Sequence, residues 1–390
     1  MIDFDFQIKT KIYFGKDKEN QVGEILKENG AHKVLIIIGQ GSVKKSRLLD
    51  RVIASLTKNQ ISYVLLEGVR ANPEVKLGNQ GIELAKEEKV DFLLAIGGGS
   101  VMDTAKYIGV GYYYDGDAFD FNLHKLAPSK SLPLGVILTI SASGSEMSTS
   151  CVMQNDESKI KSGFNSEVNR PVFAIENPEL TYTVSPYQTA CGITDIMMHT
   201  LERYFRPSDE FEPADGFALS LLKDVMKAGK VAMNNPLDYQ ARAILMLLSS
   251  LSHNGLTSIG KKPFMPVHQL EHPLSGLYPN VAHGAGLAIL FPAWARYFYK
   301  SDLNKFDRFA KEVFDLHNED KEKNSLEAIN KLEEFFASIG MPTRLSHLED
   351  DVDIEALANK ATNNGNRVID NYFDKPLDIE AARAIFKSCK

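Results

Sequence analysis

Residues 92–106, FLLAIGGGSVMDTAK, join a run of apolar residues to three consecutive glycines and then to a helical segment. The run FLLAI has the length of a β-strand, and its lack of polar residues is typical of a strand buried on both faces of a parallel sheet. The glycines mark a tight turn, and a helix is predicted after them. The stretch therefore predicts a strand, a turn and a helix in direct succession, as in a β-α-β unit.

The same alternation extends on both sides of this stretch. Strand-like runs occupy residues 33–38, 62–66, 92–96, 134–140 and 172–175, and helical segments occupy residues 48–58 and 75–89. The start of the chain, MIDFDFQIKTKIYFG, alternates apolar and polar residues and predicts a further strand. We therefore expect residues 1–184 to form an α/β domain built on a parallel sheet.

The second half has a different pattern. From about residue 185 the apolar residues recur at helical spacing, and no run is convincing as a strand. Helices are predicted over residues 186–205, 216–234, 239–251, 283–299, 303–317 and 325–339. Ser185 followed by Pro186 marks the start of the first helix, because serine caps a helix and proline suits its first position. We expect residues 185–390 to form an all-helical domain.

The composition excludes several classes of function. The 390 residues carry a net charge of -7, so the chain has no overall positive field for nucleic acid or an anionic membrane. No apolar stretch reaches the roughly 18 residues of a membrane-spanning helix, and the start lacks the pattern of a secretory signal. The 3 cysteines are far apart, which argues against disulfides and a thiolate zinc site. We expect a protein of the reducing cytoplasm, with neither nucleic acid nor membrane as a partner.

Two predicted strands end in glycine turns, IIIGQGSVKKS at residues 36–46 and the turn at residues 97–99. Such turns lie where doubly wound sheets bind ligands, and glycines and the following helix start suit a pyrophosphate. Neither turn matches G-x-G-x-x-G, and a tight turn without a ligand is the alternative for either one. The expected cofactor contacts are Gly39, Gly41, Ser42, Gly97, Gly98, Gly99 and Ser100, together with Thr139 and Ser143, hydroxyls that can equally cap a helix.

The first turn favours NADP(H) over NAD(H). In many NAD-binding folds an acidic residue takes the ribose hydroxyls, and this acid also repels a 2′-phosphate. Here the turn carries Gly39 and no acid, and Ser42 can donate a hydrogen bond to a phosphate. Lys44 and Lys45 follow, although lysines at this place are by themselves better explained as the solvated start of a helix.

Residues of the helical half are spaced as metal ligands. In GITDIMMHTLERYF, Asp195 and His199 lie four residues apart on a predicted helix, so both side chains project from one face. In VHQLEHPL, His268 and His272 have the same spacing, and His283 opens the next helix. A single histidine is more often a core residue, but imidazoles in this pattern with one carboxylate suit Fe²⁺ or Zn²⁺. We predict a divalent metal bound by Asp195, His199, His268 and His283.

Four motifs resemble the iron-containing, or group III, alcohol dehydrogenase family. They are GGGSVMDTAK, GSE, GITDIMMH and HQLEHPLSGLYPNVAHGAGLAI, at residues 97–106, 144–146, 192–199 and 268–289. The branch that the chain most resembles contains butanol dehydrogenases and NADPH-dependent aldehyde reductases. The resemblance implies a dinucleotide-binding, Rossmann-like domain followed by a helical domain, the same four metal ligands, and a homodimer.

The resemblance also implies roles for further residues. His272 would lie beside the metal without binding it, and it is our candidate for exchanging a proton with the substrate. Asp103 would lie toward the nicotinamide end of the cofactor, so Asp103 and His272 are the candidate catalytic residues. Lys161, in KSGFNS, would contact the cofactor ribose. NADP(H)-preferring relatives carry glycine where this sequence has Gly39.

These observations predict a metal-dependent oxidoreductase that interconverts small primary alcohols and aldehydes with NADP(H). The metal would polarise the substrate oxygen while the nicotinamide exchanges hydride with the carbon. Two alternatives stay open: a zinc enzyme similar to glycerol dehydrogenase or dehydroquinate synthase, and a nucleotide- or metal-sensing protein without turnover. Aromatic and aliphatic residues near the metal motifs, such as Phe264 and Leu274, favour a weakly polar substrate.

Overall fold

The computed structural model describes residues 3–206, 212–262, 264–371 and 373–390. The chain divides into two compact units: Gln7–Val184, and Ser185–Lys390 with the described residues before Gln7. Within the described ranges, no helix is both long enough and apolar enough to cross a bilayer.

The first unit is built on a six-stranded parallel sheet. In spatial order its strands are β1 (Lys11–Phe14), β8 (Phe173–Glu176), β5 (Leu134–Leu138), β4 (Phe92–Gly97), β2 (Lys33–Gly39) and β3 (Ser62–Val69). From β2 the chain crosses to β3 at the edge and then returns past β2 to β4. This reversal is a topological switch point, the place where open α/β sheets bind their ligands.

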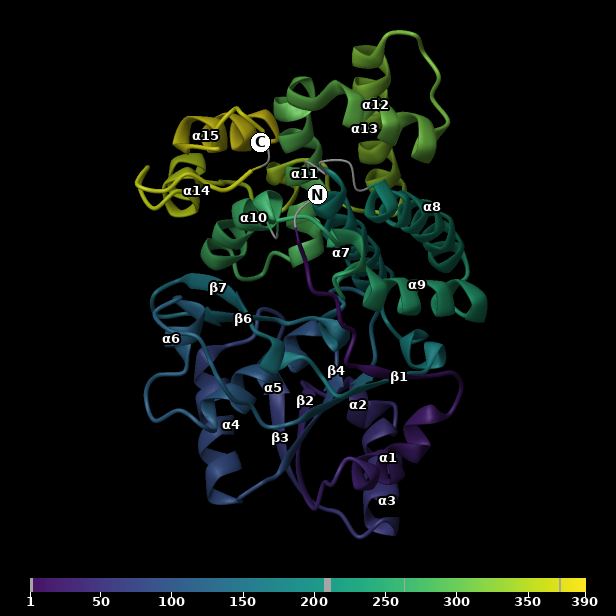
Figure 1. The fold of residues 1–390 in the computed structure, drawn as a ribbon, viewed down its shortest axis with the longest axis vertical. Helices are drawn as coiled ribbons and strands as arrows, with labels where there is room; N and C mark the ends of the chain where they lie inside the picture. The colour runs from purple at the N-terminus through teal and green to yellow at the C-terminus, as the bar shows by residue number, and fades with distance from the viewer. Residues whose placement is uncertain (1–2, 207–211, 263, 372) are drawn as a thin grey trace. The chain divides into compact units, whose positions relative to one another are not determined.

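Helices cover both faces of the sheet, as Figure 1 shows. On one face lie α1 (Val22–Glu28) and α3 (Leu48–Lys58), and on the other lie α4 (Val75–Glu87) and α5 (Gly99–Gly111). Because both faces are covered, the middle strands β4 and β5 are apolar throughout, and every residue of both is buried. The predicted Rossmann-like α/β architecture is therefore confirmed.

Some details of this unit differ from the predictions. The alternating segment at residues 3–10 has no regular secondary structure, and β1 begins only at Lys11, where its pairing with β8 begins. A strand needs a partner for its backbone groups, and alternation of side chains does not supply one. The antiparallel hairpin of β6 (Ser150–Asn155) and β7 (Ile160–Asn165) is absent from the predictions.

The second unit is helical, as predicted. Its helices are α7 (Pro186–Tyr204), α8 (Glu212–Asn234), α9 (Tyr239–Ser252), α10 (Pro266–Leu277), α11 (His283–Phe298), α12 (Leu303–Phe314), α13 (Lys321–Ser338), α14 (Ile354–Ala361) and α15 (Ile379–Ser388). Ser185 caps α7 by accepting a hydrogen bond from Gln188 N, and Pro186 is the first helical residue. In the described part of this unit, β pairing is limited to an isolated bridge between Ile369 and Leu377.

Candidate functional site

Helix α7 carries two of the candidate metal ligands on one face. Asp195 and His199 lie one helical turn apart, and only 8% and 5% of their side chains are exposed. His199 Nδ1 lies 3.7 Å from Asp195 Oδ1. Burial lowers the pKa of His199 well below its usual value, and the nearby histidines add to this effect. The ring is therefore neutral, which is the form that binds a metal.

Helix α10 brings His268 to the same point. Its Nε2 lies 3.7 Å from Asp195 Oδ1, and its Nδ1 contacts a carboxylate oxygen of Glu202 from α7. A carboxylate only accepts hydrogen bonds, so Nδ1 carries a hydrogen and Nε2 is the atom that can bind a metal. The other carboxylate oxygen of Glu202 accepts a hydrogen bond of 2.5 Å from Val267 N. One side chain thus holds both the ring and the start of α10.

The acidic neighbours of His268 also change its protonation. Burial by itself lowers the pKa of His268, but Glu202 and Asp195 outweigh it and raise the pKa to about 9. A metal that binds Nε2 must therefore displace a proton from this ring.

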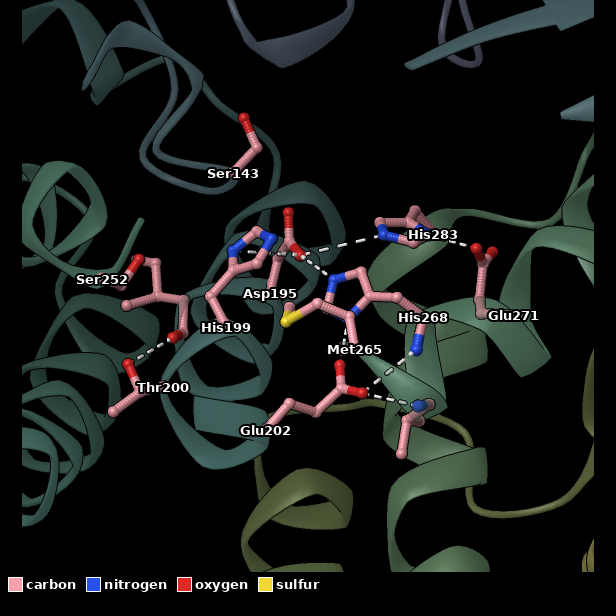
Figure 2. A network of polar contacts seen from close by, with 12 residues as sticks. Ser143, Asp195, His199, Thr200, Glu202, Ser252, Met265, His268, Glu271 and His283 are labelled. Carbon is pink, nitrogen blue, oxygen red and sulfur yellow. Dashed lines mark hydrogen bonds and ion pairs between the residues drawn. The ribbon is translucent and has the colours of Figure 1, made fainter. Parts of the chain in front are cut away.

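Helix α11 begins with the fourth candidate ligand, His283. Its Nε2 lies 3.9 Å from Asp195 Oδ1, and its Nδ1 lies 2.5 Å from Glu271 Oε2 of α10. The arrangement of His268 with Glu202 is thus repeated. Figure 2 shows both carboxylates behind their imidazole rings, on the side away from Asp195.

Gly284 allows α11 to come close enough to α7. A Cβ atom at this position would overlap the backbone carbonyl group of Cys191, one turn before Asp195. Backbone atoms cannot rotate away as a side chain can, so a larger residue would push the start of α11 outward. Gly286 is similarly close to Glu271, whose Cγ would lie 3.0 Å from an added Cβ. The two glycines therefore set the position of His283 and of its carboxylate partner.

Three buried atoms at this centre have no hydrogen-bond partner among the described residues: Asp195 Oδ1, His199 Nδ1 and His268 Nε2. Ligand atoms of these residues all lie within 4.8 Å of one another. Ligands about 2.1 Å from a tetrahedral metal are about 3.4 Å apart, close to the 3.7–3.9 Å measured from Asp195 Oδ1. Buried polar atoms without partners are costly, so this donor set fits a divalent cation.

Two more histidines lie beside the four candidate ligands. His272 is half-buried one turn after His268, and its ring centroid lies 6.2 Å from that of His283. The ring centroid of His253 lies 4.1 Å from that of His199. His272 is therefore near the centre, as its proposed role requires.

The sequence-based selection of site residues omits Glu202 and Glu271. Helix periodicity contains a signal for both, because Glu202 lies seven residues after Asp195 and Glu271 lies three residues after His268. Each carboxylate shares a helix face with a candidate ligand. Both are fully buried, and acidic residues are rarely buried without a partner.

In the first unit, the two glycine turns follow neighbouring strands at the same level. β2 and β4 pair Ile38 with Ile96, so Gly39 and Gly97 stand at the same edge of the sheet. Helix α5 begins at Gly99, and the backbone N–H groups of its first turn, including that of Ser100, are those that can bind an anion. Both turns thus lie at the switch point.

The glycines of the second turn are also required by packing within the protein. A Cβ atom at Gly98 would overlap Ile140, and one at Gly99 would lie 2.5 Å from Ser143 Oγ. The segment at residues 139–143 therefore lies directly against the turn. The lack of side chains at Gly98 and Gly99 is needed for this packing, in addition to any role in binding a ligand.

The same segment brings hydroxyl groups to the turn. Thr139 N donates a hydrogen bond of 3.1 Å to Gly97 O. Ser141 Oγ is buried, and it has no hydrogen-bond partner in the described ranges. A hydroxyl in that condition, next to a glycine turn and a helix start, fits a nucleotide phosphate or ribose.

Asp103 is held inside this unit. Its Oδ1 accepts a 2.7 Å hydrogen bond from Ser145 Oγ, and its Oδ2 accepts a 3.1 Å bond from Val152 N. Burial raises the pKa of Asp103, and the nearby charges of Lys106 and Lys161 oppose the rise. The structure thus brings Lys161, on β7, to the neighbourhood of Asp103, whose oxygens both connect α5 to the hairpin region.

The first turn is open and has an acid beside it. Gly41 has a φ of 143° and no atom within 4 Å of an added Cβ, and α2 (Ser42–Lys45) follows. The Lys44 ammonium forms an ion pair with Glu67 of β3. The turn itself carries no acid, but the neighbouring strand supplies one.

Comparison with known proteins matches both halves of the chain to family models. Residues 9–178 match the model "Iron-containing alcohol dehydrogenase", and residues 189–387 match "Fe-containing alcohol dehydrogenase family, C-terminal". The chain is 41% identical to NADH-dependent butanol dehydrogenase A of Clostridium acetobutylicum, covering 99% of each chain. It is 30% identical to the NADPH-dependent aldehyde reductase YqhD of Escherichia coli, covering 100% of each.

A solved structure shows the same similarity in three dimensions. The crystal structure of NADH-dependent butanol dehydrogenase A from Thermotoga maritima superposes with a TM-score of 0.94 at 34% identity. The match covers 99% of this chain and 98% of that one. The fold of both units is therefore shared with these proteins.

Proposed function

Because the chain belongs to the iron-containing alcohol dehydrogenase family, we propose that it interconverts small primary alcohols and aldehydes, such as butanol and butanal, with NADP(H). One observation carries the proposal: three buried donor atoms, on Asp195, His199 and His268, converge without hydrogen-bond partners among the described residues. With His283 they make a ligand set of three imidazoles and one carboxylate, which suits Fe²⁺ or Zn²⁺.

The four candidate ligands would hold the metal at a fixed position. When bound, the metal supplies a Lewis acid for the substrate oxygen, and the nicotinamide supplies or accepts hydride. Glu202 and Glu271 orient the rings of His268 and His283 and increase their basicity as ligands. Because these groups come from packed helices, they need little rearrangement when the substrate binds.

We assign proton exchange with the substrate oxygen to His272. An imidazole can release and accept a proton near neutral pH, and this one is half-buried beside His283. For Asp103 we propose a positioning role, because both of its oxygens already accept hydrogen bonds from Ser145 and Val152.

The nucleotide is assigned to the switch point of the sheet. The turn at residues 97–99 with Ser100 would bind the pyrophosphate, and Lys161 would contact a ribose. Gly39 carries no acid to repel a 2′-phosphate, and Ser42 can donate to one, which supports NADP(H). The names of the relatives divide on this point, since the two butanol dehydrogenases of Clostridium acetobutylicum are NADH-dependent and YqhD is NADPH-dependent.

The proposed enzyme works as a homodimer in a reducing cytoplasm on a weakly polar substrate. The names of the butanol dehydrogenase relatives support a small aldehyde as the substrate. Light scattering of the purified protein tests the dimer.

The test of the function is NADPH oxidation with butanal, followed by absorbance. Protein stripped of metal is reloaded with Fe²⁺, with Zn²⁺ or with nothing, and NADH is assayed in parallel. We expect activity only after reloading, and we expect His268→Ala to lose it. Activity that survives both stripping and the substitution would overturn the metal assignment. Tight NADPH binding without oxidation of any aldehyde would favour a sensing protein.

A further inference from the structure

We infer that the Lys44–Glu67 ion pair sets the choice between NADPH and NADH, with Lys44 binding the 2′-phosphate and Glu67 opposing it. This inference rests on the proposed function, because it concerns the nucleotide of that reaction. The pair lies beside the first glycine turn, where the helix α2 supplies the cation and the strand β3 supplies the anion.

Lys44 belongs to the short helix that continues directly from this turn. β2 ends at Gly39, Gly41 has its left-handed φ of 143°, and α2 starts at Ser42. Among the described residues, no atom lies within 4 Å of a Cβ placed on Gly41, so the turn leaves space for a ligand. Lys44 follows Gly41 by three residues, and its side chain is 48% exposed.

An irregularity in the sheet places Glu67. β2 and β3 pair Ile37 with Leu66, but the next pair is Gly39 with Val69, so β3 carries one extra residue there. The extra residue falls at Glu67 and Gly68, and Gly68 has a φ of 98°. Such bulges redirect a side chain out of the regular alternation, and they are frequent next to ligand sites. The bulge directs Glu67 to Lys44.

The two charges have opposite preferences for the two nucleotides. NADPH differs from NADH by a 2′-phosphate that is strongly anionic near neutral pH, so it gains from Lys44 and is repelled by Glu67. NADH presents a 2′-hydroxyl at the same place, and a carboxylate can accept a hydrogen bond from it. Both side chains are about half exposed, at 48% and 53%, and exposed ion pairs are weak. A 2′-phosphate can therefore replace Glu67 as the partner of Lys44.

The same strand offers a matched control. Lys33, at the opposite end of β2, forms an ion pair of 2.5 Å with Glu88, and their side chains are 31% and 41% exposed. This pair has the same chemistry and similar exposure, but it lies at the amino end of the sheet. Ligands of open α/β sheets bind at the carboxyl ends of the strands.

The experiment measures binding of NADPH and NADH by nucleotide fluorescence to metal-loaded wild-type protein and to Lys44→Met, Glu67→Gln, Lys33→Met and Glu88→Gln. Lys44→Met should weaken NADPH binding about tenfold, the size of one lost charge-assisted contact, and leave NADH within about twofold. Glu67→Gln should tighten NADPH binding about threefold and weaken NADH binding. The two control variants should change neither dissociation constant by more than about twofold.

Each outcome bears on the inference. If Lys44→Met weakens both nucleotides equally, or neither, the inference is wrong while the proposed function stands. If the wild type binds NADH alone, Glu67→Gln must produce measurable NADPH binding, and its failure to do so overturns the inference. If the wild type binds neither nucleotide, the inference and the proposed function fall together.

Discussion

The helical unit and the α/β unit prepare their ligand sites in opposite ways. The helical unit aims side chains at one point, and the rings of His268 and His283 each have a carboxylate behind them. The α/β unit offers backbone at its glycine turns, and at Gly98 and Gly99 packing against residues 139–143 leaves no room for a side chain. A site that binds its ligand through side chains depends on the identity of each residue. A site that binds through backbone groups depends on the room around them. Substitutions can test this difference one unit at a time.

The largest effect is expected at a ligand of the helical unit. His268→Ala removes one of four donors, so metal content should fall to background and aldehyde reduction by about 10³-fold or more. NADPH binding, which belongs to the other unit in this proposal, should stay within about twofold. Metal analysis by mass spectrometry and nucleotide fluorescence measure the two effects. His347→Ala, at an exposed histidine of the same unit, is the control. Full metal retention in His268→Ala would remove the contrast between the units.

A smaller effect is expected one layer behind the ligands. Glu202→Gln keeps the shape of the side chain but removes the charge behind His268, so metal affinity should fall by about 10–100-fold. Competition with a chelator measures the affinity. Glu333→Gln, whose partners Arg296 and Arg344 are surface residues, should leave metal affinity unchanged. Equal metal affinities for Glu202→Gln and the wild type would mean that the carboxylate only supports α10.

Gly284 is a position of the helical unit where close packing leaves no room for a larger residue. Gly284→Ala places a Cβ atom against the Cys191 carbonyl group, so the free energy of unfolding should fall by about 1–3 kcal/mol, with weaker metal binding. Gly216→Ala, on α8, where the described part of the chain places no atom within 4 Å of the added Cβ, should instead gain about 0.5–1 kcal/mol. Denaturant unfolding of both variants measures the difference. A Gly284→Ala protein as stable as the wild type would show that α11 can shift without cost.

The smallest effect is expected in the glycine turn. Gly98→Ala directs a Cβ atom at Ile140, a side chain that can rotate, so we expect about tenfold weaker binding of both nucleotides. Metal content should be unchanged. Nucleotide titration of the metal-loaded variant measures the first effect, and metal analysis the second. Loss of metal together with nucleotide would show that the two sites are not independent.

The sequence can group the candidate ligands of one helix because helix periodicity is visible in one dimension. Asp195 and His199 project from one face wherever α7 lies, and the same holds for His268 on α10. Glu202 and Glu271 have equally regular spacing. They are missed because an acidic residue on a helix is usually solvated, and only the packed structure shows that both are buried.

The central strands of the α/β unit are the ones that composition predicts most directly. Residues 34–38 of β2 and the strands β4 and β5 are continuously apolar, so their composition alone identifies strands of a parallel sheet. The hairpin strands β6 and β7 mix polar and apolar residues without strict alternation. The contact of Lys44 with Glu67 lies at a bulge, for which Gly68 inside the strand is a sequence signal, but the order of residues does not show which side chain the bulge brings to Lys44.

The position of Glu202 has a consequence for how the protein acquires its metal. Its two carboxylate oxygens hold the start of α10 and the ring of His268, so the fold itself organises the centre. A polypeptide whose coordination sphere is built in advance does not need the ion as a template for folding. For the proposed enzyme we therefore expect loading to be a late step in maturation, and unloading to leave an intact apoprotein that accepts another cation. We expect the cell's supply of iron and zinc, rather than the folding pathway, to select the ion.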